Sequence, residues 1–257
     1  MKSSDAELPV RTCRGADGLA LAYREMGEGR PLILLHGLFS NGYTNWVRYG
    51  HAGMLADAGF RVILPDLRAH GESAAPHDPA AYPSDILAED GLALVTHLGF
   101  DDGAYDLGGY SLGARTTARM LVMGAQPRRA ILAGMGLTGM RNTEARAKFF
   151  RHVLRDYGLH ERGSPAWMAE AFLKINGGDR LALLPLLDSF VDTSDEELAR
   201  ISVETLVLCG VDDQDNGSAD ALARMLPHGS HVAVPGNHMT AVVDPALGRA
   251  MAEFLLA

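Results

Sequence analysis

Short apolar runs alternate with segments of helical pattern along most of this chain, and no other feature of the sequence restricts the fold as strongly. The runs are LALAYREMG, PLILLHG, RVILPDL, AYDLGGYS, RRAILAGMG, TLVLCGVDD and HVAVPGNH. Such alternation predicts a mainly parallel sheet with helices on both faces. The 257 residues are 47% hydrophobic, which is enough to bury one large core, so we expect one compact unit.

The two ends of the chain depart from this rhythm. Residues 10–26 contain no helical pattern between their apolar stretches, which predicts an antiparallel hairpin that turns near residues 16–18. Near the C-terminus, Asp244 and Pro245 form a typical helix start, and apolar residues follow at intervals of three and four. We therefore expect the chain to close with a helix docked on the sheet.

The segment 138–195 contains helical patterns but no strand-like run. Its apolar stripes are Phe150, Val153, Leu154 and Tyr157, then Met168, Ala171, Phe172 and Ile175, then a cluster over residues 181–190. Insertions of this length in an alternating fold are often functional lids. We therefore divide the chain into a core of residues 1–137 and 196–257 and a helical lid of residues 138–195. The alternative is that these helices only pad the sheet.

The strongest chemical signal is Gly109-Tyr110-Ser111-Leu112-Gly113, a G-x-S-x-G motif between a strand-like run and a helical stretch. A turn this tight forces unusual backbone angles on the serine, and glycines on both sides avoid collisions with the strand and the helix. The serine hydroxyl is then exposed above the sheet, next to the N-terminus of the helix. Ser111 is the predicted nucleophile.

With HGLF after an apolar run and PDLRAHGES further on, GYSLG makes the chain resemble the α/β-hydrolase family over nearly its whole length. This resemblance implies an α/β fold with a mostly parallel eight-stranded sheet flanked by helices and a small helical lid between strands 6 and 7. It also implies that the backbone N–H groups of Leu38 and Leu112 form an oxyanion hole. His36 is expected to be structural, as are four polar residues of PDLRAHGES, namely Asp66, Arg68, His70 and Ser73.

Hydrolases of this fold carry their catalytic residues in the order serine, acid, histidine. Val211-Asp212-Asp213-Gln214-Asp215 follows the run TLVLCG, and His238 follows HVAVPGN. Both groups lie just beyond predicted strands, at the sheet edge where catalytic groups gather in such folds. His238 is the predicted base.

Three aspartates compete for the role of the acid. Neighbouring side chains alternate along an extended chain, so Asp212 and Asp213 cannot both face His238. In family members the acid commonly follows the glycine at the strand end by three positions, which points to Asp213 after Gly210. Asp215 is expected to cap the helix that begins near Ser218.

Arg115, the two cysteines and two further histidines lie outside these motifs. Arg115 is expected to pair with an acid on the helix surface, with a substrate carboxylate as the alternative partner. Cys13 and Cys209 are expected to be buried, inert thiols. His228 and His231 lack further ligands, and no phosphate-binding loop is present, so we expect neither a metal nor a cofactor.

The charge balance disfavours several kinds of partner. The chain has 23 basic and 32 acidic side chains, a formal net charge of −9, and its only adjacent basic pair is Arg128 and Arg129. Nucleic acids and anionic membranes are therefore not expected partners. The start, MKSSDAELPVRT, shows no signal peptide, and no run reaches the roughly 18 apolar residues of a membrane span, which favours a cytoplasmic protein.

These features predict an enzyme that cleaves a small, mostly apolar ester, thioester or lactone through an acyl-enzyme. A C–C bond hydrolase and a cofactor-free perhydrolase would use the same residues, while epoxide hydrolases and haloalkane dehalogenases would require an aspartate in place of Ser111. A slow-turnover ligand receptor is the alternative from another class. The expected partner is a small-molecule substrate, and the protein is expected to be a monomer or a homodimer.

Overall fold

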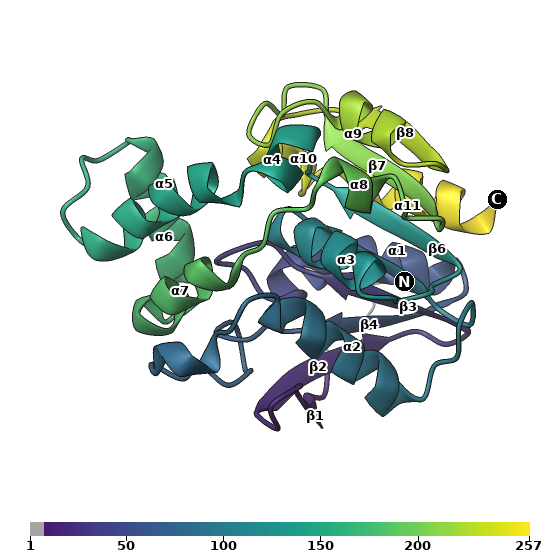
Figure 1. Cartoon of the computed structure of the whole chain (residues 1–257), viewed down its shortest axis with the longest axis horizontal. Helices are drawn as coiled ribbons and strands as arrows, with labels where there is room; N and C mark the ends of the chain where they lie inside the picture. The colour runs from purple at the N-terminus through teal and green to yellow at the C-terminus, as the bar shows by residue number, and fades with distance from the viewer. Residues whose placement is uncertain (1–7) are drawn as a thin grey trace.

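A sheet of eight strands forms the centre of the protein (Figure 1). The computed structural model describes residues 8–257, so the first seven residues, where we expect no signal peptide, lie outside it. In their order across the sheet, the strands are β1 (Arg11–Arg14), β2 (Ala20–Met26), β4 (Phe60–Pro65), β3 (Arg30–Leu35), β5 (Asp106–Tyr110), β6 (Arg129–Ala133), β7 (Glu204–Gly210) and β8 (Gly229–Val234). Strand β2 runs antiparallel to β1 and β4, and all other neighbours are parallel. The mostly parallel eight-stranded sheet is thus confirmed.

The apolar runs form these strands because most of the sheet is buried on both faces. In β3, Ile33 and Leu35 pack on one face, while Leu32 and Leu34 pack on the other. The predicted hairpin is present, with Arg14 opposite Ala20 across its turn. Side chains of both faces are apolar in the central strands, so their sequence reads as a continuous run rather than an alternation.

Helices cover both faces of the sheet. Those of the core are α1 (His51–Asp57), α2 (Ile86–Leu98), α3 (Leu112–Val122), α8 (Asp195–Leu198), α9 (Ala219–Met225), α10 (His238–Ala241) and α11 (Pro245–Leu256), with a π-helix at Tyr43–Val47 and a 3₁₀ turn at Pro79–Ala81. In Figure 1, α2 and α3 lie in front of the sheet and α1 and α11 behind it. The C-terminal helix begins as predicted, since the Asp244 side chain accepts a hydrogen bond from the Ala246 N–H at 2.8 Å.

The order of the strands places a crevice above the middle of the sheet. The chain runs from β3 out to β4 and then crosses back to β5, which pairs with the other side of β3. Ligands in open α/β sheets bind at such a reversal, outside the carboxyl ends of the strands. The loops after β3 and β5, which hold Leu38 and Ser111, both start at this point.

The segment 138–195, called the insertion below, connects β6 to β7 and forms helices that project beyond the sheet on the left of Figure 1. Its helices are α4 (Leu137–Arg141), α5 (Thr143–Arg155), α6 (Pro165–Ile175) and α7 (Arg180–Leu186), followed by a 3₁₀ turn at Leu187–Ser189. Polar side chains begin three of them. Asn142 caps α5, Ser164 caps α6 and Asp179 caps α7.

The most buried side chains of helix α6 are not those of its apolar stripe. Met168 and Ile175 are 54% and 72% exposed, whereas Glu170 and Leu173 are buried. The Glu170 carboxylate accepts a hydrogen bond from the Gly158 N–H at 2.7 Å. It also forms a salt bridge with Lys174, one turn further along α6. Because these partners compensate the buried charge, the helix can pack with its Glu170 side against α5.

Candidate active site

Ser111 lies at the sharp turn between β5 and α3. Its backbone has φ 56° and ψ −109°, a region that residues with a side chain rarely adopt. A Cβ atom on Gly109 would lie 2.3 Å from the carbonyl carbon of Gly113, and one on Gly113 would lie 2.2 Å from the oxygen of Leu35. The two glycines of the motif are therefore required by the close approach of α3 to β5 and β3.

The structure brings Ser111, Asp213 and His238 together at the carboxyl ends of β5, β7 and β8. The Nε2 atom of His238 lies 3.0 Å from the Ser111 Oγ, and its Nδ1 atom lies 2.8 Å from the Asp213 Oδ2. Since Nδ1–H donates to a carboxylate, Nε2 is free to accept the proton of the serine hydroxyl. The imidazole thus connects the serine to the acid in one hydrogen-bonded chain.

Asp213 sits in a tight turn that begins at Gly210, to whose carbonyl its N–H donates at 3.0 Å. Its carboxylate also accepts hydrogen bonds from the Asp215 N–H at 3.1 Å and from the Cys209 thiol at 3.4 Å. Burial by itself raises the pKa of this carboxyl, but the hydrogen bond and charge of His238, with these two donors, outweigh burial and hold the pKa below its usual value. The acid is therefore ionised where it meets the imidazole.

The other two aspartates of the loop lie elsewhere. Asp212 is exposed, and Asp215 forms a salt bridge of 3.1 Å with Arg146 of helix α5. The expectation that Asp215 caps the next helix is wrong, because Ser218 is itself the cap of α9 and accepts from the Ala221 N–H at 3.1 Å. Asp215 instead connects the loop after β7 to the insertion.

The two predicted oxyanion donors flank Ser111. Leu112 is the first residue of α3, so its N–H is one of those that no carbonyl of the helix can reach. The turn after β3 approaches from the other side, since a Cβ atom on Gly37 would lie 3.7 Å from the Cβ of Ser111. Between residues 8 and 257, no protein acceptor takes the N–H of Leu38.

Two buried histidines hold this turn in place. The rings of His36 and His70 lie 4.9 Å apart, and each ring accepts a backbone N–H, from Leu67 at 2.9 Å and from Phe39 at 3.3 Å respectively. Burial, together with the repulsion that a proton on His36 would exert, lowers the pKa of His70 to about 3. Both rings are thus neutral acceptors, and neither lines the cavity that contains Ser111.

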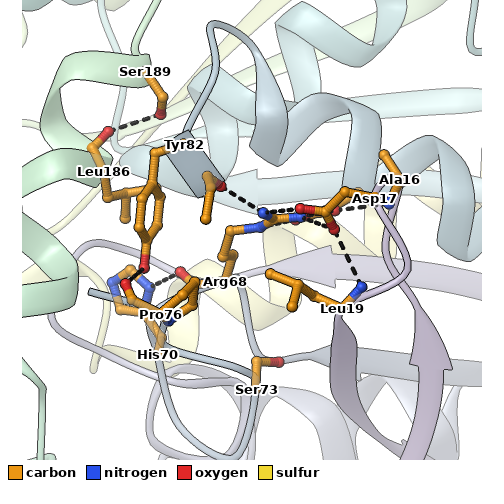
Figure 2. Close-up of polar contacts among 12 residues, drawn as sticks. Ala16, Asp17, Leu19, Arg68, His70, Ser73, Pro76, Tyr82, Leu186 and Ser189 are labelled. Carbon is orange, nitrogen blue, oxygen red and sulfur yellow. Dashed lines mark hydrogen bonds and ion pairs between the residues drawn. The ribbon is translucent and has the colours of Figure 1, made fainter. Parts of the chain in front are cut away.

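The remaining polar residues of PDLRAHGES make contacts within and between loops. The Arg68 guanidinium binds Asp90 at 2.9 Å and Asp17 at 2.7 Å, and Figure 2 shows it reaching toward Asp17 and the hairpin. Asp66 accepts from the Gly42 N–H at 2.8 Å, and the Ser73 hydroxyl donates to the Asp66 carbonyl at 2.5 Å. These bonds tie the loop to its neighbours and leave it away from Ser111.

Arg115 is buried rather than paired on the helix surface. It is 7% exposed and has no ion pair with any residue that the structure describes. Its guanidinium lies 5.6 Å from the centre of the Phe190 ring, and burial lowers its pKa to about 10. The expectation that Arg115 pairs with an acid on the helix surface is therefore wrong. Arg115 also lies outside the lining of the cavity around Ser111.

A cavity of about 390 Å³ opens above Ser111 and His238. Core and insertion both contribute to its walls, with Leu38, Phe39, Tyr110, Met239 and Val242 from the core and Phe149, Phe150, Met168, Ala169 and Phe172 from α5 and α6. The polar side chains of the wall are Ser40, Asn45, Arg146 and Asp215. Of these four, only Asp215 was considered for the site in the sequence. No motif marks Ser40 and Asn45, which lie in the loop and turn after β3, and Arg146 reaches the cavity only because the insertion folds onto the core.

Between residues 8 and 257, no group of three His, Cys, Asp or Glu side chains is arranged to hold a metal ion. No helix in that range is both long and apolar enough to cross a membrane.

Comparison with known proteins identifies the family. The model of the alpha/beta hydrolase family matches residues 32–249. The chain is 29% identical over 238 residues to the non-heme chloroperoxidase CPO-A1 of Kitasatospora aureofaciens, covering 80% of this chain and 82% of that protein. It is 36% identical over 88 residues to the bifunctional epoxide hydrolase 2 of Sus scrofa, a match that covers 34% of this chain and only 15% of that much longer protein.

Among solved structures, a thermophilic esterase from Thermogutta terrifontis superposes with a TM-score of 0.77 at 25% identity, covering 96% of this chain and 98% of that one. The family model spans most of the sequence, and the structural likeness spans nearly all of it. The chain belongs to the alpha/beta hydrolase family, and it is a hydrolase with the fold of that family.

Proposed function

We propose that this protein is a serine hydrolase that cleaves a small, mostly apolar ester, thioester or lactone through an acyl-enzyme. The observation that carries the proposal is the hydrogen-bonded chain in which His238 lies 3.0 Å from the Ser111 Oγ and 2.8 Å from Asp213. A serine, a base and an orienting acid in this geometry are the parts that nucleophilic acyl transfer needs.

In the first half-reaction, His238 Nε2 takes the proton of Ser111 as its Oγ attacks the substrate carbonyl carbon. The N–H groups of Leu38 and Leu112 donate to the resulting oxyanion, and one such donor is typically worth about 10²–10³ in turnover. Asp213 keeps the proton of the imidazole on Nδ1 and stabilises the imidazolium. His238 then gives its proton to the leaving oxygen or sulfur, and the acyl group stays on Ser111.

In the second half-reaction, the same imidazole removes a proton from water, which attacks the carbonyl of the acyl-enzyme. The C–O bond to Ser111 breaks, the proton returns to the serine oxygen, and a carboxylic acid leaves. No other group is required, so we propose a reaction without metal or cofactor.

The cavity walls indicate the class of substrate. Most of the lining is apolar or aromatic, and the volume of about 390 Å³ suits a small molecule. Since α5 and α6 supply seven of the eighteen lining residues, we propose that residues 138–195 act as a lid that encloses the substrate. A peptide chain would require a longer open groove.

We propose a cytoplasmic protein that is a monomer or a homodimer. Cys13 and Cys209 are free, buried thiols, which supports a cytoplasmic location. The active site is built from residues of one chain, so a monomer is sufficient for activity and a homodimer is compatible with it. A small-molecule substrate is the expected partner.

The likeness to non-heme chloroperoxidase CPO-A1 over 80% of the chain favours a second candidate, a cofactor-free perhydrolase. In that reaction hydrogen peroxide replaces water, its oxygen attacks the acyl-enzyme, and a peracid leaves. C–C bond hydrolysis and slow-turnover ligand binding would also use these residues. Epoxide hydrolysis is less well supported, because Ser111 occupies the position of the aspartate nucleophile that we expect in such enzymes.

The test is multiple-turnover hydrolysis of 4-nitrophenyl acetate, with labelling by a fluorophosphonate. We expect many turnovers, labelling at Ser111 alone, and activity that persists in EDTA. Ser111→Ala should abolish labelling and lower turnover by on the order of 10⁶. Release of only one equivalent of nitrophenol would support a receptor, and labelling of Ser111→Ala would refute the proposal. Faster product formation in hydrogen peroxide would support the perhydrolase.

A further inference from the structure

A second depression lies in the insertion, beside the cavity that contains Ser111. Its volume is about 490 Å³, and it opens between α5 and α6. His152 lines it from α5 and Asp156 from the C-terminal cap of that helix, and Leu159, His160 and Glu161 line it from the connection to α6. It is called the outer depression below, and the cavity around Ser111 is called the inner cavity.

The two spaces share walls. Phe149 of α5 and Pro165 of α6 line both the inner cavity and the outer depression. Along α5, Arg146, Phe149 and His152 follow at intervals of three, with the C-cap Asp156 four residues further, and therefore lie on one face of the helix. One groove between α5 and α6 thus extends outward from the mouth of the inner cavity. Phe149 and Pro165 separate the inner cavity from the outer depression within this groove.

The Phe149 side chain is fixed on its inner side. Its ring lies 5.2 Å from the ring of Phe150, which in turn lies 5.3 Å from Phe39 in the core, both in edge-to-face contact. Aromatic pairs of this geometry add to the stability of the packing. Phe149 itself is only half-buried, because its other side faces the outer depression.

The spaces on the two sides of Phe149 differ in chemistry. The inner cavity is mainly aromatic and aliphatic, whereas the outer depression contains the polar pair of His152 Nδ1 and Asp156 Oδ2, 2.8 Å apart, and the carboxylate of Glu161. The outer depression still offers apolar surface at Pro165, Ala166 and Leu159, of which Leu159 is 82% exposed. An alkyl chain could therefore be covered there once it passed Phe149.

We propose that Phe149 limits the length of the substrate's acyl chain by closing the inner cavity against the outer depression. This inference rests on the proposed function, since it concerns the acyl group of the same ester substrate. Chains that end within the inner cavity bury every methylene, and each buried methylene raises kcat/KM about fourfold. Longer chains meet the Phe149 ring and gain nothing further.

The experiment measures kcat/KM for 4-nitrophenyl esters of saturated acids with even chain lengths from two to about sixteen carbons. The readout is the ratio of kcat/KM for the dodecanoate to that for the butyrate. Phe149→Ala should raise this ratio at least about tenfold, because additional methylenes then become buried. Phe149→Trp, which keeps an aromatic ring in the packing, should lower it.

Trp167→Ala is the matched control, because Trp167 is an aromatic residue of α6 that lines neither space. It should leave the ratio unchanged. An equal rise in Trp167→Ala and Phe149→Ala would mean that general loosening of the insertion sets chain length. No change in either Phe149 variant would also overturn the inference. Phe149→Trp decides the matter if Phe149→Ala fails to fold.

Binding of saturated fatty acids of the same lengths, followed by calorimetry, separates this inference from the proposed function. If the enzyme hydrolyses no ester, the proposed function fails. Affinity that rises with chain length further in Phe149→Ala than in the parent still supports the limit at Phe149. Parallel affinities in both proteins would refute it whether or not esters are cleaved.

Discussion

The phenol of Tyr110 donates a hydrogen bond of 2.6 Å to the backbone carbonyl of His238. The residue that precedes Ser111 thereby holds the backbone of the residue that faces Ser111. Tyr110 is buried, and its ring lies 5.3 Å from the imidazole of His238. The distance between the Ser111 and His238 side chains therefore depends on the Tyr110 hydrogen bond, in which neither of these two side chains takes part.

Tyr110→Phe should lower kcat roughly tenfold, because a small displacement of the base is costly for proton transfer, while KM changes little. It should also lower the free energy of unfolding by about 1–3 kcal/mol, since a buried carbonyl loses its partner. Tyr82→Phe is the matched control. Tyr82 is also buried and donates to a backbone carbonyl, that of Pro76 at 2.7 Å, but away from the site (Figure 2). A similar loss of kcat in both variants would contradict the positioning role.

Asp213→Asn should preserve the fold and lower kcat by about 10⁴, because the imidazole loses the acceptor that fixes its tautomer. Asp215→Asn should leave kcat within a few-fold of the parent, since Asp215 contacts Arg146 and donates only its backbone N–H to Asp213. Steady-state kinetics on a short-chain ester measure both. The reverse order of effects would transfer the role of the acid to Asp215.

Both thiols should resist modification in the native protein. Burial, followed by the charge of Asp213, raises the pKa of Cys209 to about 12, and burial also raises the pKa of Cys13. Since only the thiolate reacts, the aromatic disulfide reagent DTNB at about pH 8 should label neither residue until the protein is unfolded. Rapid labelling of native protein that is lost in Cys209→Ala would show that this thiol is accessible.

Stability should fall as the solution is acidified below neutrality. Burial lowers the pKa of His70 from the ordinary 6.5 to about 3, so between these values the unfolded chain binds a proton that the folded chain does not. The free energy of unfolding therefore rises with pH in this window, by at most about 1.4 kcal/mol per pH unit for this residue. Urea unfolding at several pH values measures the slope. His70→Gln should flatten it, and an unchanged slope would mean that His70 titrates normally.

Much of the fold and the triad geometry could be predicted because local chemistry determines them. The Ser111 turn needs glycines on both sides whatever surrounds it, and strands buried on both faces must be apolar throughout. Asp213 and His238 follow such strands, and parallel strands bring their carboxyl ends to the same edge. The strand order confirms the predicted eight-stranded sheet, while the catalytic roles of Ser111, Asp213 and His238 stay predictions.

Contacts between distant segments could not be predicted in the same way. Arg146 and Asp215 are 69 positions apart, and nothing near either residue indicates the other. The apolar stripe of α6 does not mark the deepest buried side of the helix, because Glu170 finds partners when buried, which a pattern of hydrophobicity does not reveal. Arg115 was misplaced for a similar reason, since the segment around Phe190 returns from the insertion to cover it.

The left-handed backbone of Ser111 means that selection for activity and selection for stability act in opposite directions at this residue. A serine at φ 56° and ψ −109° carries strain of about 1–3 kcal/mol, while glycine adopts these angles freely. A chain under selection for stability alone would be expected to exchange this serine for glycine and to lose the hydroxyl beside His238. Persistence of the serine in a lineage would therefore indicate that its chemistry is still in use.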